Sequence, residues 1–327
     1  MRIRRCSDEL AHKEIAHNMI VRPAGAVVAA AAAASLTSRL RCSLVEPDAI
    51  RRLDDGLFYN ENFYAHNIWE IKVDEALLDE AAGIFWEGQP FASLLQPGEP
   101  YADLATPSGL RFFAQRVTWD SDISWISTDD MRSYEAFESI FERMRLPELF
   151  APVVPHRRRL RMYNAFFVCR TKCAAHDFHV DYHRTVGTKA LTLIAPLRDY
   201  KETDSFQLSY KSRPAAKAAS SSSDSGIHDD GEKVRRYPYK KGRAVVFSSG
   251  FEHSTEPGCG QDGEPHVYLC FTFGTDQQEA WPEISKTLGT QSRVVMHPDG
   301  VMRLSQLGEG IEEAIAAAQH EQQALTT

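Results

Sequence analysis

Four short apolar runs between residues 160 and 273 most constrain the fold of this chain. They cover residues 160–168, 189–197, 242–252 and 267–273. Each has the length and the content of β-branched and aromatic residues expected of a β-strand. Because short strands of this kind must pair in a sheet and bury a face, the runs predict a β core for the second half of the chain.

Three potential metal ligands accompany these runs. His179 and Asp181 form a His-x-Asp triplet after the first run, and His253 directly follows the third. Alternate residues of an extended strand point to one side, so His179 and Asp181 share a face that a neighbouring strand can bring to His253. Two imidazoles and one carboxylate on one side of a metal leave other positions open, which suits non-haem Fe(II). A His-x-Asp triplet alone is weak evidence, because surface pairs of these residues are common.

The order of runs and ligands over residues 159–276 resembles the Fe(II)/2-oxoglutarate-dependent dioxygenases. The stretch GRAVVFSSGFEHS at residues 242–254 is similar to that family's pattern of a buried strand, a turn and then the second histidine ligand. The resemblance implies an α+β fold. Its core would be a double-stranded β-helix of the jelly-roll or cupin-like type, with flanking N-terminal helices and a C-terminal helix.

The same resemblance implies a reaction. Fe(II) and O2 would couple the decarboxylation of 2-oxoglutarate to succinate with oxidation of an unactivated C–H bond, and ascorbate could serve as a reductant. The substrate would be a small molecule or a peptide side chain, and hydroxylation is the expected outcome, with desaturation or cyclisation as others. The carboxylate of Asp181 argues against a halogenase, in which a small residue frees this position for halide. Two alternatives remain open: a jelly-roll binding module without turnover, and a zinc-dependent hydrolase.

The far carboxylate of 2-oxoglutarate needs a cation, because an unpaired buried carboxylate is costly. Many family members carry an Arg on the strand after the second histidine ligand, but this chain has no Arg between His253 and Arg293. We expect Lys189 to take this role, since some members use a Lys on the strand after the triplet. Thr192 would join it only across a bulge. The other candidates for cosubstrate contacts are Tyr163 with Arg161 on the same face of one run, His266 with Tyr268 on the same face of another, and Arg243.

Two further histidines flank the triplet. His176 and His183 could line the substrate pocket or support the metal ligands, as could Asn164. Alternatively, His176 and His179 could hold zinc with His183 or Cys173 in support. Structural zinc sites are usually built from thiolates or from His pairs on a helix turn, whereas the segment around His179 has an extended pattern.

Charge and cysteine content narrow the range of partners and compartments. The formal net charge of −8 argues against nucleic acid as a partner, because binding its backbone needs a clustered basic surface. The basic run at residues 156–161 is the local exception and suits a solvated entry to a strand. Six cysteines without a CxxC pair indicate neither a zinc finger nor a disulfide framework. We therefore expect an intracellular, reducing compartment, which would also keep iron ferrous.

The chain divides into an N-terminal extension and one predicted oxygenase domain. Residues 1–45 are expected to be a flexible extension or an organellar targeting segment, whose apolar run is too short to span a bilayer. Residues 46–327 form the domain: mixed support at 46–150 with helices at 73–86 and 129–144, the β core at 151–276, and a helical segment at 277–327. A low-complexity insertion is expected at 211–236. Aromatic side chains in the support region could line a pocket or belong to the core: Trp69, Trp86, Phe112, Phe113, Trp119 and Trp125.

Overall fold

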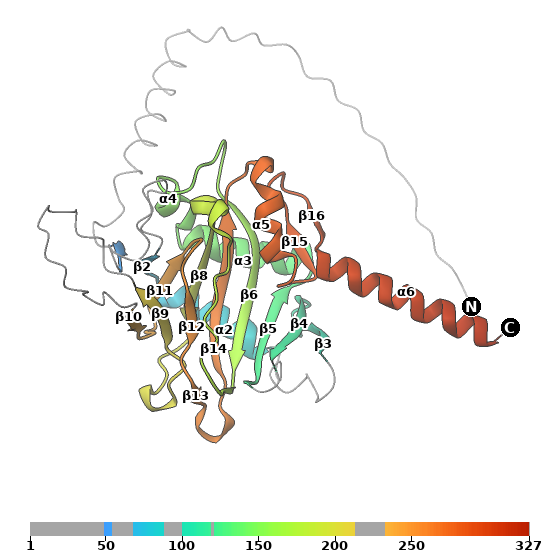
Figure 1. Ribbon diagram of the computed structural model, residues 1–327, viewed down its shortest axis with the longest axis horizontal. Helices are drawn as coiled ribbons and strands as arrows, with labels where there is room; N and C mark the ends of the chain where they lie inside the picture. The colour runs from blue at the N-terminus through green and yellow to red at the C-terminus, as the bar shows by residue number, and fades with distance from the viewer. Residues whose placement is uncertain (1–48, 54–67, 88–99, 119–120, 213–232, 327) are drawn as a thin grey trace, which may run out of the picture. The chain divides into compact units, whose positions relative to one another are not determined.

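A computed structural model describes residues 49–53, 68–87, 100–118, 121–212 and 233–326 (Figure 1). The predicted extension at 1–45, most of the predicted insertion and Trp119 lie outside the described residues. The helices are α2 (Glu75–Glu87), α3 (Met131–Arg143), α4 (Leu146–Phe150), α5 (Trp281–Leu288) and α6 (Gln306–Thr326), with short 3-10 turns η2 (Arg184–Lys189), η3 (Glu202–Asp204), η4 (Gln261–Gly263) and η5 (Gln278–Ala280). The strands are β1 (Ile50–Arg52), β2 (Ile68–Lys72), β3 (Tyr101–Ala105), β4 (Arg111–Thr118), β5 (Ile123–Thr128), β6 (Arg161–Arg170), β7 (Lys172–Cys173), β8 (Ala190–Pro196), β9 (Leu208–Ser212), β10 (Lys233–Tyr237), β11 (Arg243–Phe247), β12 (His253–Thr255), β13 (Gly258–Cys259), β14 (His266–Gly274), β15 (Val294–Met296) and β16 (Met302–Leu304).

A nine-stranded antiparallel sheet organises the domain. Its strand order is β1-β2-β11-β8-β14-β6-β5-β4-β3. The four predicted apolar runs became the four adjacent strands β11, β8, β14 and β6 at its centre. Ladder pairing is continuous along β14 except for a register shift, because Thr272 pairs with Asn164 but Phe273 pairs with Met162. Tyr163 is therefore the extra residue of a β-bulge.

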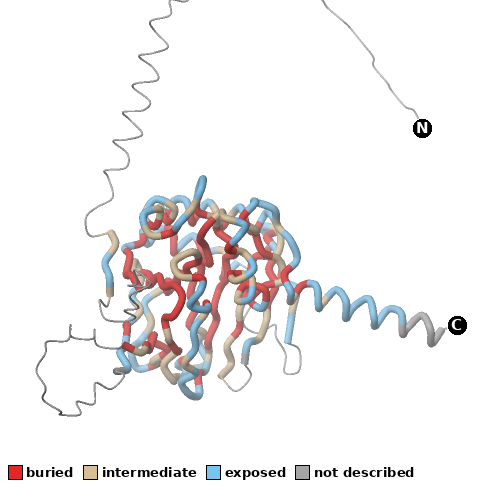
Figure 2. The backbone as a smooth tube through the Cα atoms, turned by 45° about the horizontal axis from the view of Figure 1, so that its top comes forward, coloured by how far each residue is buried: buried red, intermediate tan, exposed pale blue. Residues whose placement is uncertain are grey.

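One face of this sheet packs against helices. On β14 the alternate residues Leu269 and Phe271 belong to a large apolar core that also contains the buried sides of α2, α3 and α4. Phe137 of α3 packs edge-on against Phe167 of β6, with ring centroids 5.4 Å apart. Figure 2 shows the buried residues concentrated in these strands and in the helices that cover them. Contacts of this geometry add about 0.5–1.5 kcal/mol each beyond the burial of their area.

The opposite face of the large sheet packs against a small one. Strands β10, β9 and β12 form a three-stranded antiparallel sheet, and a bridge between His179 and His253 adds the chain around His179 to its edge. A second apolar core joins the two sheets: Phe166 and Val168 of β6 and Tyr268 of β14 meet Leu208 and Tyr210 of β9. The central strands are therefore buried on both faces, and the site lies between the sheets.

The described residues refine several expected boundaries. The insertion expected at 211–236 is shorter, because β9 continues to Ser212 and pairs there with Lys233 at the start of β10. The expected helical segment at 277–327 also contains the hairpin of β15 and β16. Predicted helices 73–86 and 129–144 correspond to α2 and α3. Within the described ranges, we find no helix that is both long and apolar enough to cross a membrane.

Candidate metal centre

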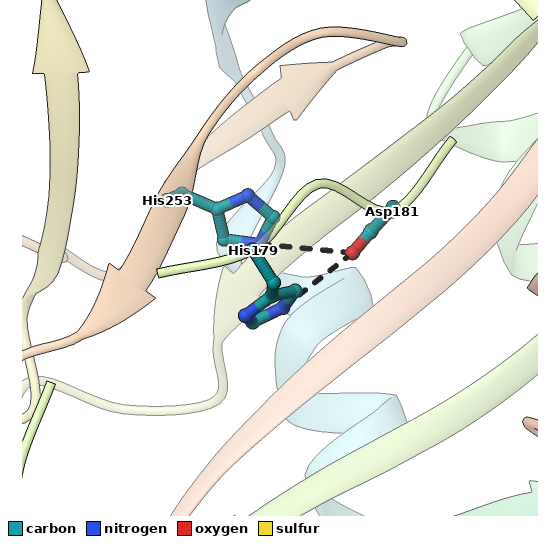
Figure 3. A group of neighbouring side chains, drawn as sticks. All are labelled: His179, Asp181 and His253. Atoms are coloured by element: carbon teal, nitrogen blue, oxygen red, sulfur yellow. Dashed lines mark ion pairs between the residues drawn. The ribbon is translucent and has the colours of Figure 1, made fainter. Parts of the chain in front are cut away.

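The structure brings His179, Asp181 and His253 together (Figure 3). Oδ1 of Asp181 lies 3.7 Å from Nε2 of His179 and 3.8 Å from Nε2 of His253. The candidate ligand atoms all lie within 4.8 Å of one another. One metal ion between these atoms would meet two imidazole nitrogens and one carboxylate oxygen on one side. In the part of the chain that the structure describes, this is the one cluster of three or more such side chains with that spacing.

Backbone pairing holds the two imidazoles in place. The amide of His179 donates to the carbonyl oxygen of His253, and the amide of His253 donates back, both at 2.9 Å. His179 makes this bridge alone and Asp181 lies in a bend, so the triplet is not the continuous strand that its alternation predicts. The bend nevertheless brings the three side chains together, because it turns the Asp181 carboxylate toward both imidazole rings.

Hydrogen bonds also orient each side chain. Nδ1 of His179 lies 2.8 Å from the carbonyl oxygen of Asp177, and Nδ1 of His253 lies 3.0 Å from that of Phe251. Since a carbonyl only accepts, both Nδ1 atoms carry the proton and both Nε2 lone pairs face the centre. Thr192 of β8 donates its hydroxyl to Oδ2 of Asp181 at 3.0 Å, which leaves Oδ1 toward the imidazoles. Such contacts fix ligand geometry in metal sites.

Burial keeps His253 in the form that binds metals. It lowers the pKa of His253 to about 4, with a smaller contribution from His179, while the Asp181 carboxylate opposes the shift. The imidazole is therefore neutral near pH 7, and its Nε2 lone pair is free for a cation. His179 is by contrast half-exposed, so one ligand lies in the core and the other at the rim.

A cavity of about 450 Å³ opens beside the three ligands. Its floor is the inner face of β6, β8 and β14, and its walls are the segment before the triplet and the hairpin of β4 and β5. It is lined by Val117, Ser121, Ile123, Trp125, Phe166, Val168, Arg170, Cys173, Ala174, Ala175, His176, Asp177, His179, Asp181, Thr192, Ile194, Leu208, His253, Ser254, Thr255, Cys270 and Gln291.

Arg170 is the cationic residue of this cavity, and sequence reasoning missed it. It ends β6 and is 8% exposed, with Cζ 4.8 Å from the ring centroid of Tyr268. Its Nε and Nη1 atoms are buried and have no hydrogen-bond partner among the described residues. A buried cation with free donors is costly unless an anion pairs with it. The available signal was the alternation of β6, which places Arg170 on the same face as Phe166 and Val168.

Most residues expected to contact the cosubstrate lie elsewhere. Of those predicted, Thr192 alone is among the described lining residues, and its hydroxyl binds Asp181. Lys189 is the last residue of the turn η2, so it precedes strand β8. By alternation it would share a face with Leu191, which packs on the helix side of the sheet. Arg243 pairs with Glu70 at 2.5 Å. Arg170 of β6 therefore lines the cavity, and neither Lys189 nor Arg243 does.

Tyr163 and Arg161 lie at the bulge in β6. Strict alternation would put both on the face opposite Phe166, Val168 and Arg170, and Tyr163 is the extra residue that interrupts the ladder. The Tyr163 hydroxyl donates to the carbonyl oxygen of Thr275 at 2.7 Å, and its ring packs against Trp281. Arg161 lies instead against Gly300. Neither residue lines the cavity.

His266 and Tyr268 lie outside the described cavity lining and each contact other side chains. Nε2 of His266 lies 3.1 Å from Oδ2 of the buried Asp204, and its ring stacks on Tyr200 with centroids 3.9 Å apart. Tyr268 lies beneath the guanidinium of Arg170, and burial raises the pKa of its hydroxyl to about 12 despite that cation. Tyr268 thus supports Arg170 and stays neutral.

The remaining polar candidates divide between the cavity and its surroundings. His176 lines the cavity and stacks on Phe178. His183 is exposed and bonds Thr185, and Asn164 accepts from Thr128 inside the core. No zinc cluster of His176 or His183 with His179 is present among the described residues. The aromatic residues divide too: Trp125 lines the cavity, whereas Trp69, Phe112 and Phe113 are buried in the core and Trp86 packs against it.

Comparisons with known proteins find similarity in structure only. No protein family and no curated protein matches this sequence. A prolyl-4-hydroxylase from Pseudomonas putida is 15% identical, covers 64% of this chain and 92% of its own, and superposes with a TM-score of 0.37. HygX from Streptomyces hygroscopicus, with nickel and 2-oxoglutarate bound, is 13% identical over 64% and 83% of the chains, with a TM-score of 0.38. SnoN, a non-haem α-ketoglutarate-dependent epimerase of nogalamycin biosynthesis, is 12% identical over 63% and 78%, with a TM-score of 0.36.

Proposed function

We propose that this protein is an Fe(II)- and 2-oxoglutarate-dependent oxygenase. The observation that carries the proposal is one cavity that holds two different sites. At one, His179, Asp181 and His253 offer three donors on one side. At the other, Arg170 offers a buried guanidinium without an anion. A 2-oxo acid with a second carboxylate matches both, since its oxo-acid end chelates a metal and its far end pairs with a cation.

The residues present fit this assignment. Nε2 of each histidine and Oδ1 of Asp181 would hold the iron, which when bound supplies the O2 chemistry that no side chain provides. Arg170 would bind the far carboxylate, with Tyr268 beneath its guanidinium. The apolar floor between these two ends excludes water, which strengthens the pairing of the carboxylate with the cation.

We infer that the facing sheets form a double-stranded β-helix. The central strands β6, β14, β8 and β11 lie opposite β12, β9 and β10, with the segment at His179 bridged to the edge. This arrangement supports the proposal because it places the segment of the triplet beside β12, which begins with His253.

Hydroxylation of a C–H bond is the proposed outcome, with O2 as a cosubstrate. A reducing compartment would suit ferrous iron, and the described cysteines are all free. The proposal therefore extends to an intracellular enzyme, whose N-terminal residues could target it to an organelle.

Succinate formation tests this proposal. Purified protein freed of metal is supplied with Fe(II), 2-oxoglutarate, ascorbate and O2, and succinate is measured with and without iron. We expect slow iron-dependent succinate formation in the wild type and none in Asp181→Ala. Asp79→Ala is the matched control, because Asp79 pairs with Lys241 on the exposed side of α2. Binding of neither Fe(II) nor 2-oxoglutarate would instead indicate a binding module, and tight retention of zinc without succinate formation would indicate a hydrolase.

A further inference from the structure

The floor of the cavity continues past the small sheet onto β5. Ladder pairs place Ile123 beside Arg170 and Trp125 beside Val168, so both share the inner face of the large sheet. Trp125 and Ile123 are only partly buried, whereas Phe166 and Val168 are buried under the small sheet. The inner face therefore extends as an uncovered ledge beyond β6.

The ledge is apolar and adjoins the candidate metal centre. We define the β5 shelf as Ile123, Trp125 and Val117. Val117 lies in the bulge between Arg116 and Thr118 and is 42% exposed. All three line the same cavity as the metal ligands. A molecule on this shelf would therefore lie beside the metal without displacing the groups that hold it.

Small residues line the cavity beside the shelf. Ala174 and Ala175 line the cavity there, and the amide of Ala174 donates to the hydroxyl of Ser121 at 3.1 Å. That bond ties the segment leading to the metal triplet to the β4–β5 hairpin. This part of the cavity, the slot, is thus lined by the indole of Trp125 and by the methyl groups of Ala174 and Ala175, which suits a flat apolar body.

Charge at the slot disfavours an anion. Among the described lining residues, Arg170 is the one Arg or Lys, and the other basic side chains are histidines. Asp177 adds a negative charge. If the far carboxylate of the cosubstrate pairs with Arg170, no further cationic side chain in the cavity can pair with a second anion. Gln291 is the neutral exception: it is 7% exposed, lines the cavity, and its Oε1 is buried without a hydrogen-bond partner among the described groups.

We propose that the substrate of the proposed oxygenase is a small, uncharged molecule with a flat apolar body and a hydrogen-bond donor. Its ring lies on the β5 shelf against Trp125, and its N–H or O–H donates to Gln291. The inference rests on the proposed function, because Arg170 must be occupied by the cosubstrate. Trp125 and Gln291 are then the specificity-determining residues of the site.

Four indoles with matched bodies test the proposal by calorimetry, without oxygen and with Fe(II) and 2-oxoglutarate present. Indole is neutral and carries a donor, 1-methylindole lacks the donor, indole-3-acetate is anionic, and a capped Gly-Trp-Gly peptide presents the ring on a chain. We expect indole to bind at least about tenfold more tightly than indole-3-acetate or the peptide. Its affinity should fall about tenfold in Trp125→Ala, as expected for loss of an aromatic stack, and stay unchanged in Trp86→Ala. Trp125→Leu, which keeps the apolar volume, replaces the alanine variant if that variant is insoluble.

A comparison of indole with 1-methylindole tests the hydrogen bond to Gln291. The wild type should prefer indole to 1-methylindole, and Gln291→Ala should abolish the preference. Equal or tighter binding of indole-3-acetate or of the peptide would overturn the inference, as would binding of no probe to protein that binds both Fe(II) and 2-oxoglutarate. Failure to bind Fe(II) or 2-oxoglutarate is a different result, and it would overturn the proposed function itself.

Discussion

The two faces of the large sheet differ in what they bury. On the helix side, strands β6 and β14 present Phe167, Leu269 and Phe271 to an apolar core. On the cavity side, Arg170 of β6 borders a cavity of about 450 Å³ beside the three candidate metal ligands. Alternation within single strands thus separates a packed face from a hollow, polar one.

The packed face stabilises the fold, and the hollow face is available for ligands. A face filled with interlocking aromatic rings lowers the free energy of the folded state. A face that keeps a cavity and an unpaired guanidinium raises it, and such costs are typical of binding sites. Substitutions on the helix face should therefore lower stability without changing ligand binding, and those on the cavity face should weaken ligand binding without lowering stability.

The largest expected effect is on the cavity face. Asp181→Ala removes the carboxylate that both imidazoles face, so Fe(II) binding should fall below detection in calorimetry while the circular dichroism spectrum stays that of the wild type. Asp79→Ala should bind Fe(II) normally. Normal Fe(II) affinity in Asp181→Ala would remove this residue from the metal centre.

On the helix face we expect a large loss of stability. Phe137→Ala leaves a cavity against Phe167 and Phe271, and should lower the free energy of unfolding by about 3–5 kcal/mol. Urea denaturation measures it. The folded fraction should keep the Fe(II) affinity of the wild type, and a coupled loss of Fe(II) binding would show that the two faces are not separable.

Arg170→Met should stabilise the protein in the absence of ligands. It replaces buried donors that lack partners by an apolar chain, and the free energy of unfolding should rise by about 1–3 kcal/mol. Arg293→Met is the paired counterpart. Arg293 bonds Asp129, so its loss should destabilise by about 3–5 kcal/mol. A less stable Arg170→Met protein would mean that the guanidinium serves the fold.

The smallest effect concerns the hydroxyl on Asp181. Thr192→Val keeps the shape of β8 but frees Oδ2, so the carboxylate can rotate. We expect Fe(II) affinity to fall about tenfold, the lower end for a group that supports a metal ligand. Thr192→Ser should restore it. An unchanged affinity in Thr192→Val would show that the bend in the chain alone orients Asp181.

Strand positions were predictable because they depend on local alternation. The runs at 160–168 and 267–273 became β6 and β14, and the spacing of His179, Asp181 and His253 predicted their meeting. The cation was not predictable in the same way. Arg161 and Tyr163 alternate with Phe167 and not with Phe166, and η2 delays the start of β8 past Lys189. Arg170 becomes evident only when the neighbouring strands show which face it shares.

If one cavity joins a metal centre to a carboxylate-binding cation, the protein should distinguish two oxo acids that differ only in the far carboxylate. Binding of 2-oxoglutarate and of 2-oxobutyrate, which lacks the far carboxylate, is measured without oxygen in Fe(II)-loaded wild type and Arg170→Met. We predict that the wild type favours 2-oxoglutarate by at least about a hundredfold, the scale of a buried charge pair, and that Arg170→Met binds both acids alike. Equal binding by the wild type, or discrimination that survives in Arg170→Met, would contradict the claim.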